Sequence, residues 1–209
     1  MLSNTDISNT LSSYQVSPDA LLCDRIRTYT SVLLRWNERV SLTTVTDPQD
    51  ILRFHFGESF LASSAVPIRF GRLADVGSGA GFPGIPLAMM APDLLATLIE
   101  SNVKKSAFLS EVIRALALEN VSVVRSRMEN FPSNPPGFDF VTARAVGRFE
   151  ALLKWSGSAL AKSGNVVLWV GEDDSAMIVR NSEWSWREPI QIPRSRSRFL
   201  LVGSPIRAK

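Results

Sequence analysis

Three glycines that alternate after an acidic residue are the part of the sequence with the clearest chemistry. The apolar stretch 73–76 contains Asp75 and leads directly into Gly77, Gly79 and Gly81. Glycine has no Cβ, so it adopts positive φ easily and lets the backbone approach a ligand closely. A strand followed by such a turn is typical of nucleotide-cofactor sites. We therefore expect a cofactor to bind at this turn.

The glycines fit two cofactor patterns. Residues 79–84 match the dinucleotide fingerprint G-x-G-x-x-G, and Glu100 stands where a ribose-binding acid is expected. Read from Asp75, the same stretch is D-x-G-x-G-x-G, the pattern of S-adenosylmethionine (SAM) methyltransferases. Pro83 and Pro86 remove N–H donors that a pyrophosphate would need, and a carboxylate before the turn would attract a cation and repel a phosphate. The pattern favours SAM, with an NAD-dependent oxidoreductase as the last alternative.

Later strand ends carry side chains that could complete this site, because ligands of an open α/β sheet bind at the carboxyl ends of its strands. We expect Glu100 to bind the ribose hydroxyls, Met128 to lie against the adenine and Glu129 to meet its amino group. Arg144 and Arg127 would lie where the methyl acceptor approaches. The structural alternatives are a helix-dipole partner for Glu100, core packing for Met128 and an ion pair for Arg144.

Composition limits the remaining possibilities. The chain has 209 residues, of which 45% are hydrophobic and 21% charged, as in an ordinary globular protein with one full core. No apolar run reaches membrane-spanning length and the first ten residues do not resemble a signal peptide, so we expect a cytoplasmic protein that contacts no membrane. Cys23 is the only cysteine and His55 the only histidine, which argues against a disulfide and against a metal site.

Positive charge is concentrated in the later part of the chain. Lys and Arg against Asp and Glu number 5 to 7 in residues 1–65, 11 to 8 in residues 66–170 and 7 to 5 in residues 171–209. Arg194, Arg196 and Arg198 alternate along one segment. This distribution suits a phosphate-rich partner, although a solvated basic surface is the plain alternative.

The elements needed to position these residues follow from the sequence pattern. Ser17-Pro18 predicts the start of a helix whose apolar stripe extends to Val40, and Asp47-Pro48 predicts a second, short helix. From residue 67, predicted strands (72–76, 96–100, 121–125, 138–142 and 165–170) alternate with predicted helices (85–90, 103–118 with Ser101 as its cap, and 149–160). We predict an α/β fold with a mostly parallel sheet, helices on both faces and a terminal antiparallel pair, divided into a helical extension (1–66) and a sheet domain (67–209).

One short motif is set aside. Residues 134–136 (Asn-Pro-Pro) are similar to the N-P-P-aromatic motif of enzymes that methylate exocyclic amines, but they precede the fourth predicted strand and Gly137 replaces the aromatic residue. We interpret them as a turn.

The sequence resembles the bacterial 16S ribosomal RNA guanine-N7 methyltransferases, also named glucose-inhibited division protein B. The resemblance covers nearly the whole chain, and the extension F-P-G-I-P-L of the glycine turn is more specific than the glycines alone. The other matching residues are Arg35-Trp36-Asn37, Leu42-Thr43, Asp47-Pro48, His55, Glu58-Ser59, Lys104-Lys105, Ser126-Arg127, Glu129, Phe131-Pro132 and Arg144-Ala145.

The resemblance implies a class I, Rossmann-like fold and a SAM-dependent methyltransferase that modifies 16S rRNA or a small-subunit particle. The oligomeric state does not follow from the sequence, and a monomer is favoured. It implies SAM contacts at Gly77, Phe82, Met128 and Glu129, with Arg144 at the site. Guanine N7 carries a free lone pair, so its methylation needs placement and no general base. Arg144 and Arg127 are accordingly expected to position the substrate.

Five positions depart from the family pattern. Val170 stands before Gly171 where the family usually has Lys, and three residues of the amino-terminal region, Ser41, Thr46 and Phe54, replace commonly polar or basic ones. These four changes concern the RNA side, which leaves two alternatives: a methyltransferase of the same fold that acts on another RNA or a small molecule, and a SAM-binding, RNA-associated protein without turnover. The fifth position, Gly57, replaces a usually apolar residue and has no explanation in the sequence.

Overall fold

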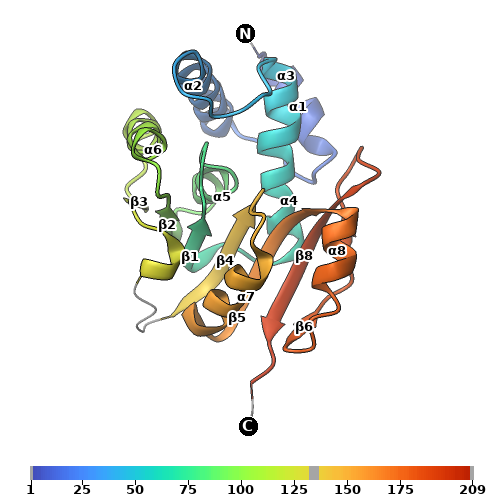
Figure 1. Cartoon of the computed structure of the whole chain (residues 1–209). Coiled ribbons are helices and arrows are strands. Elements are labelled where there is room, and N and C mark those ends of the chain that lie inside the picture. The colour runs from blue at the N-terminus through green and yellow to red at the C-terminus, as the bar shows by residue number, and fades with distance from the viewer. Residues whose placement is uncertain (1, 132–136, 208–209) are drawn as a thin grey trace.

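A single sheet organises the computed structural model, which describes residues 2–131 and 137–207 (Figure 1). Its strands follow the order β3-β2-β1-β4-β5-β8-β6, with β7 paired to β8. The first five are parallel, and β8 runs antiparallel to β5, β6 and β7, as the sequence predicted. The strands are β1 (Phe70–Val76), β2 (Asp93–Ile99), β3 (Val121–Val124), β4 (Phe138–Arg144), β5 (Leu160–Gly171), β6 (Trp184–Trp186), β7 (Ile190–Gln191) and β8 (Arg198–Pro205).

Helices lie on both faces of this sheet. The amino-terminal part supplies α1 (Asn4–Ser12), α2 (Ala20–Asn37), α3 (Pro48–Asp50), the π-helix η1 (Ile51–Gly57) and α4 (Glu58–Ala65). The alternating part supplies α5 (Gly84–Met90), α6 (Val103–Ala115), the 3₁₀ turn η2 (Met128–Asn130), α7 (Phe149–Ala159) and α8 (Glu172–Ile178).

Neighbouring residues of a strand enter two different apolar clusters, because successive side chains of a strand point to opposite faces. Leu73 of β1 packs in a cluster with the amino-terminal helices, α5 and α6, whereas Ala74 packs in a cluster with α7 and α8. Val167 and Val166 of β5 divide in the same way. The predicted arrangement of helices on both faces is confirmed. The first cluster also crosses residue 66, so any division of the chain into 1–66 and 67–209, which we still propose from the order of the elements, leaves a shared core.

Two predicted N-cap residues were wrong by one or two positions, although the predicted start of α6 at Val103 is confirmed. The N-cap of α2 is Asp19, whose Oδ1 accepts a hydrogen bond from the Leu22 N–H at 2.7 Å, and Pro18 lies before the cap. The N-cap of α6 is Asn102 and not Ser101. In both cases an Asp or Asn one or two residues downstream of the chosen serine accepts from the free N–H groups of the first turn.

The amino-terminal segment holds elements that the sequence analysis did not predict. Helix α1 begins with a capping box in which Ser3 and Asp6 exchange hydrogen bonds, and it buries Ile7 and Leu11. The capping-box spacing was a readable signal. The short helix expected at Asp47-Pro48 continues through η1 into α4, whereas α2 ends before Val40. The turn predicted at residues 134–136 lies outside the described residues.

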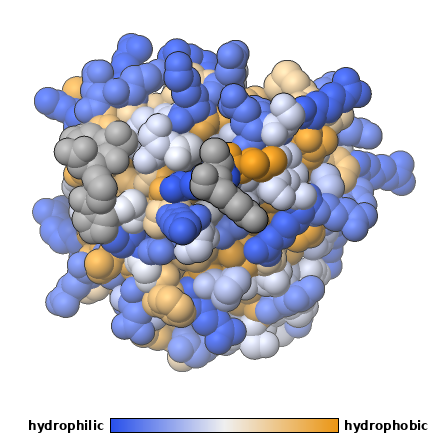
Figure 2. Space-filling view, turned by 90° about the horizontal axis from the view of Figure 1, so that it is seen from below, coloured by the Kyte–Doolittle hydropathy of each residue, from blue (hydrophilic) through white to orange (hydrophobic). Residues whose placement is uncertain are grey.

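The amino ends of the parallel strands form the face opposite the expected site. On this face, hydrophilic side chains surround apolar ones that occur singly or in small groups (Figure 2). Phe70, the first residue of β1, is 71% exposed. Among the helices that the structure describes, none has the length and apolar character needed to cross a bilayer.

Candidate active site

A pocket opens at the carboxyl ends of β1, β2 and β3, where the sequence placed the cofactor. It has a volume of about 210 Å³. We call it the glycine-turn pocket, and it is lined by Val76, Gly77, Ile99, Glu100, Ser101, Ser126, Arg127, Met128, Glu129, Val146 and Arg148. Five of the predicted site residues therefore meet here: Gly77, Glu100, Arg127, Met128 and Glu129. The other five, Asp75, Gly79, Gly81, Phe82 and Arg144, are absent from this lining.

Positive φ angles shape the turn that forms one wall. Gly77, Gly79 and Gly81 have φ of 68°, 55° and 84°, a region that side chains with a Cβ rarely adopt. A Cβ on Gly77 would meet only Val146, at 3.4 Å, whereas one on Gly81 would overlap the Tyr29 hydroxyl. The first glycine thus leaves space beside the pocket, and the third lets a helix approach the turn.

Glu100 connects the turn to the next strand. Its side chain is buried, and its two carboxylate oxygens accept hydrogen bonds from the Gly79 N–H at 2.9 Å and the Asn102 N–H at 2.7 Å. Each carboxylate oxygen has a second lone pair. Glu100 can therefore hold the turn in place and still accept hydroxyl groups from a ligand in the pocket.

Met128, Glu129 and Arg127 form the opposite wall. Met128 is buried and also packs in the second apolar cluster, so its two alternative roles, pocket lining and core packing, coexist. Glu129 is ion-paired with Arg148 at 2.9 Å, an exposed pair that the sequence analysis did not identify. The wall offers an apolar surface with charged groups at its rim.

Asp75 lies beneath the turn and does not line the pocket. It is 1% exposed, and its Oδ1 accepts a hydrogen bond from the Thr142 hydroxyl on β4 at 2.8 Å. Burial raises the pKa of Asp75 to about 6, although the hydrogen bond from Thr142 opposes the shift. The carboxylate thus joins two strands under the glycine turn, instead of facing a ligand directly as the sequence suggested.

Phe82 lies outside the glycine-turn pocket, between the turn and the amino-terminal helices. Its ring stacks on Tyr29 at a centroid distance of 5.0 Å and on His55 at 4.8 Å. The Tyr29 hydroxyl donates a hydrogen bond to the Ala80 carbonyl at 2.6 Å. Tyr29 lies in the helix that the sequence predicted with an apolar stripe, and nothing in that apolar pattern indicated this polar contact with the turn.

Arg144 is absent from the pocket lining and is ion-paired with Glu58. The side chain of Glu58 is 1% exposed, and its carboxylate forms ion pairs with Arg144 at 3.1 Å and Arg198 at 2.8 Å. The ion-pair alternative for Arg144 is therefore what the structure shows. Burial raises the pKa of Glu58, and the nearby charges of Arg144, Arg198 and Arg53 oppose this shift. We call Glu58, Arg53, Arg144 and Arg198 the Glu58 cluster.

His55 lies beside the Glu58 cluster as a neutral imidazole. Burial, followed by the nearby charge of Arg144, lowers the pKa of His55 to about 4. Its Nε2 is 2.8 Å from the Thr43 hydroxyl. Because an imidazole with this pKa is uncharged at neutral pH, His55 adds no positive charge to the cluster.

The structure shows the surroundings of Gly57 and Val170, two of the positions that depart from the family pattern. A Cβ at Gly57, the last residue of η1, would overlap the ring of Tyr14. The absence of a side chain at Gly57 therefore lets the turn that follows α1 pack against η1. Val170 is buried in the second apolar cluster, where it replaces the cation expected of the family.

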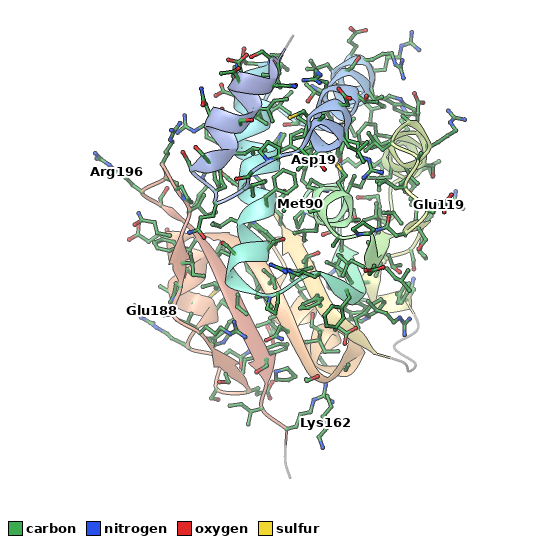
Figure 3. All side chains as sticks on the ribbon, turned by 180° about the vertical axis from the view of Figure 1, so that it is seen from behind. Asp19, Met90, Glu119, Lys162, Glu188 and Arg196 are labelled. Atoms are coloured by element: carbon green, nitrogen blue, oxygen red, sulfur yellow. The ribbon has the colours of Figure 1, made fainter. Side chains whose placement is uncertain are left out.

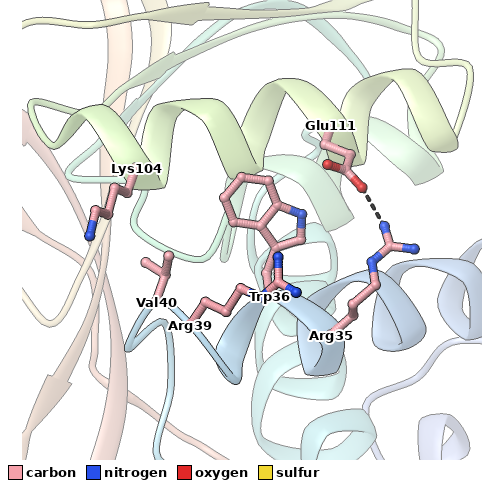
Figure 4. Close-up of a pocket in the computed structure, with 6 residues that line it drawn as sticks. All are labelled: Arg35, Trp36, Arg39, Val40, Lys104 and Glu111. Carbon is pink, nitrogen blue, oxygen red and sulfur yellow. Dashed lines mark hydrogen bonds and ion pairs between the residues drawn. The ribbon is translucent and has the colours of Figure 1, made fainter.

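A second hollow lies between α2 and α6. It has a volume of about 410 Å³ and is lined by Arg35, Trp36, Arg39, Val40, Lys104 and Glu111 (Figure 4). Arg35 is ion-paired with Glu111, and the Trp36 indole lies between this pair and Lys104 in the view of Figure 4. Its residues contribute more positive than negative charge around an aromatic ring.

Comparison with solved structures shows the fold. A ribosomal protein L11 methylase from Lactobacillus delbrueckii subsp. bulgaricus superposes with a TM-score of 0.61 at 14% identity, over 74% of this chain and 80% of that one. The M. jannaschii TYW2 structure in complex with AdoMet (SAM) superposes with a TM-score of 0.51 at 19% identity, over 66% and 70%. The architecture is that of a class I SAM-dependent methyltransferase.

Sequence comparison shows the family. Proteins named ribosomal RNA small subunit methyltransferase G are 36% identical in Xylella fastidiosa, over 83% of this chain and 82% of the relative, and 34% identical in Roseiflexus castenholzii, over 91% and 86%. The family model described as rRNA small subunit methyltransferase G matches residues 22–188. The chain therefore belongs to the rRNA small subunit methyltransferase G family.

Proposed function

We propose that this protein transfers the methyl group of SAM to N7 of a guanine in the 16S rRNA of the small ribosomal subunit. One observation carries the proposal: a pocket beside the glycine turn brings Gly77, Glu100 and Met128 together at the carboxyl edge of the sheet. Membership of the rRNA small subunit methyltransferase G family supports the ribosomal substrate.

The pocket residues fit SAM. Gly77 leaves room for the cofactor to approach the backbone, Glu100 has free lone pairs for the ribose hydroxyls, and the Met128 side chain offers an apolar surface for adenine. Glu129 would accept from the adenine amino group, although it must share its carboxylate with Arg148. Asp75, Gly79, Gly81 and Phe82 would act from behind the pocket by fixing the turn.

The transfer step itself makes few demands on the protein. When bound, SAM supplies a methyl group on a positively charged sulfur. The N7 lone pair forms the new bond to that methyl carbon, and the electrons of the breaking carbon–sulfur bond remain on sulfur. No proton is removed from N7, so the residues have only to orient the guanine and exclude water.

Arg127 and Arg144 are proposed as positioning residues on the acceptor side. Arg127 lines the pocket, whereas Arg144 ends β4 and is held by Glu58. A guanidinium can donate to guanine O6 or to a phosphate. Simultaneous donation to N7 would block the lone pair, so the proposal limits these contacts to O6 and the backbone.

Labelled methyl transfer tests the proposal. The protein is incubated with tritiated SAM and with small-subunit particles that lack the modification, and the RNA is then cleaved chemically at 7-methylguanine. We expect label in the 16S rRNA and cleavage at one guanine. Label without cleavage would move the target to another atom, whereas calorimetric binding of SAM without label would mean a protein without turnover on this substrate.

A further inference from the structure

The buried carboxylate of Glu58 holds two guanidinium groups, more than its own charge requires. Its Oε2 lies 3.1 Å from Arg144 and its Oε1 lies 2.8 Å from Arg198. A single arginine would neutralise a buried carboxylate. With Arg53 close by, the Glu58 cluster keeps a net positive charge, and the neighbouring His55 and Tyr14 are neutral at pH 7 because burial lowers the pKa of the first and raises that of the second.

The two bound arginines lie at the carboxyl edge of the parallel strands, the same edge as the glycine-turn pocket. Arg144 is the last residue of β4, and Arg198 is the first residue of β8, where it pairs with Gly171 at the end of β5. The backbone of Glu58 is fixed to the same edge, since the Trp169 indole donates a hydrogen bond to the Glu58 carbonyl at 2.7 Å. One carboxylate thus sets the spacing of cations from two strands.

Helix geometry and aromatic stacking orient the cluster further. Glu58 directly follows the π-helix η1, a rare conformation that is frequently found at functional sites. Within η1, Phe54 lies under two guanidinium groups, at 4.7 Å from Arg53 and 5.0 Å from Arg198. Stacking on a ring restricts the planes of both groups while their N–H edges remain available for other partners.

Donor capacity remains at this edge. Within the described residues, Arg144 Nη1 and Arg53 Nε are buried without a hydrogen-bond partner, and the side chain of Arg198 is 36% exposed. Arg196 projects from the adjoining β7–β8 connection at the outside of the molecule (Figure 3). Oriented guanidinium groups with free donors are suited to bind phosphate oxygens.

We infer that Glu58 is a positioning residue that holds Arg144 and Arg198 as a paired site for backbone phosphates of the RNA next to the target base. The inference rests on the proposed function, because that function supplies the phosphates. It assigns the phosphate contact to Arg198, with Arg53 beside it, and assigns to Glu58 the orientation of the two guanidinium groups. Arg144 then faces the nucleotide whose base enters the active site.

Salt dependence separates a phosphate contact from a structural role. Each phosphate that a protein neutralises makes log K fall more steeply with log salt by about one. Binding of unmodified small-subunit particles is therefore measured between 50 and 300 mM KCl for the wild type, Arg198→Gln and Arg180→Gln. Arg180, an exposed cation just after α8, is the matched control for charge loss. We expect the slope of log K against log salt to become shallower by about one for Arg198→Gln and to stay unchanged for Arg180→Gln. Arg198→Gln is also expected to raise the KM for the particle approximately 5- to 10-fold.

Two further variants test the carboxylate. Glu58→Gln keeps all the cations, so we expect an unchanged or steeper salt slope together with at least a tenfold fall in kcat and a SAM Kd within twofold of the wild type. Arg198→Lys keeps the charge but loses the planar fork, so it is expected to keep the slope and to lower kcat, and it serves in place of Glu58→Gln if that variant does not fold.

The outcomes are distinct. Equal slopes for Arg198→Gln and Arg180→Gln would overturn the phosphate contact, and an unchanged kcat for folded Glu58→Gln, or for Arg198→Lys in its place, would overturn the positioning role. A wild-type protein that binds the particles but adds no methyl group contradicts the proposed function instead, since the salt slopes are measured without catalysis.

Discussion

Two regions at the same edge of the sheet are built in opposite ways. The glycine-turn pocket is lined by the glycine turn and by side chains of segments that follow β2, β3 and β4, and its central hydrogen bond joins the Gly79 N–H to the Glu100 carboxylate. The Glu58 cluster uses long charged side chains that come from η1, α4, β4 and β8. The first region is formed within residues 76–148, whereas the second joins the amino-terminal helices to β4 and to β8 near the end of the chain. The contrast suits a small, constant cofactor beside a large, charged substrate.

Replacing Glu100 is the strongest way to test whether the two regions are functionally separate. Glu100→Ala removes both possible ribose contacts and leaves the Gly79 and Asn102 N–H groups without their acceptor. We expect SAM binding to weaken roughly 100-fold, equivalent to about 2.7 kcal/mol. Calorimetry measures the effect, with Glu119→Ala as control because Glu119 is an exposed acid directed to solvent (Figure 3). An equal loss in Arg198→Gln would show that the regions are not separate.

The pH dependence of stability is expected to report on the second region. The pKa of His55 is about 4 in the folded protein, below its ordinary value of 6.5, so between these values only the unfolded chain binds the proton. The contribution of the neutral His55 side chain to the free energy of unfolding is then fully present above pH 6.5 and is lost as the pH falls toward 4. We expect the free energy of unfolding of the wild type to fall by about 2–3 kcal/mol more than that of His55→Gln between pH 7.5 and 4.5.

Urea unfolding at the two pH values measures this difference. Gln keeps a polar group that can contact the Thr43 hydroxyl but cannot titrate. If the free energy of unfolding falls by the same amount in the wild type and in His55→Gln, then His55 is not the group whose protonation destabilises the protein.

The smallest effect is expected from weakening the contact of Tyr29 with the glycine turn, which connects the amino-terminal helices to the cofactor site. Tyr29→Phe keeps the stack on Phe82 but removes the hydrogen bond to Ala80 in the glycine turn. One such bond contributes about 1 kcal/mol, so we expect roughly fivefold weaker SAM binding and a similar loss of stability. Tyr14→Phe is the matched control, because the buried Tyr14 hydroxyl has no hydrogen-bond partner within the described residues. If Tyr29→Phe behaves like Tyr14→Phe, the helices do not support the turn.

The sequence analysis was most successful where function depends on local pattern. The glycine turn, the acid at Glu100 and the residues at Met128 follow strands whose apolar runs are readable, and the parallel sheet brings their ends together by its topology alone. Helix boundaries were less secure. Ser17 and Ser101 are plausible caps, and only the hydrogen bonds of Asp19 and Asn102 distinguish the residues that act.

The sequence by itself determined the α/β order, the cofactor turn and its acidic partner, because each depends on residues within one or two elements. The tertiary structure alone decided that Asp75 lies beneath the turn, that Phe82 packs between Tyr29 and His55, and that Glu58 binds Arg144 and Arg198. The physical reason is that a buried charge must find its partners in space. In this fold the partners of Glu58 lie 86 and 140 residues away along the chain, where no local pattern can indicate them.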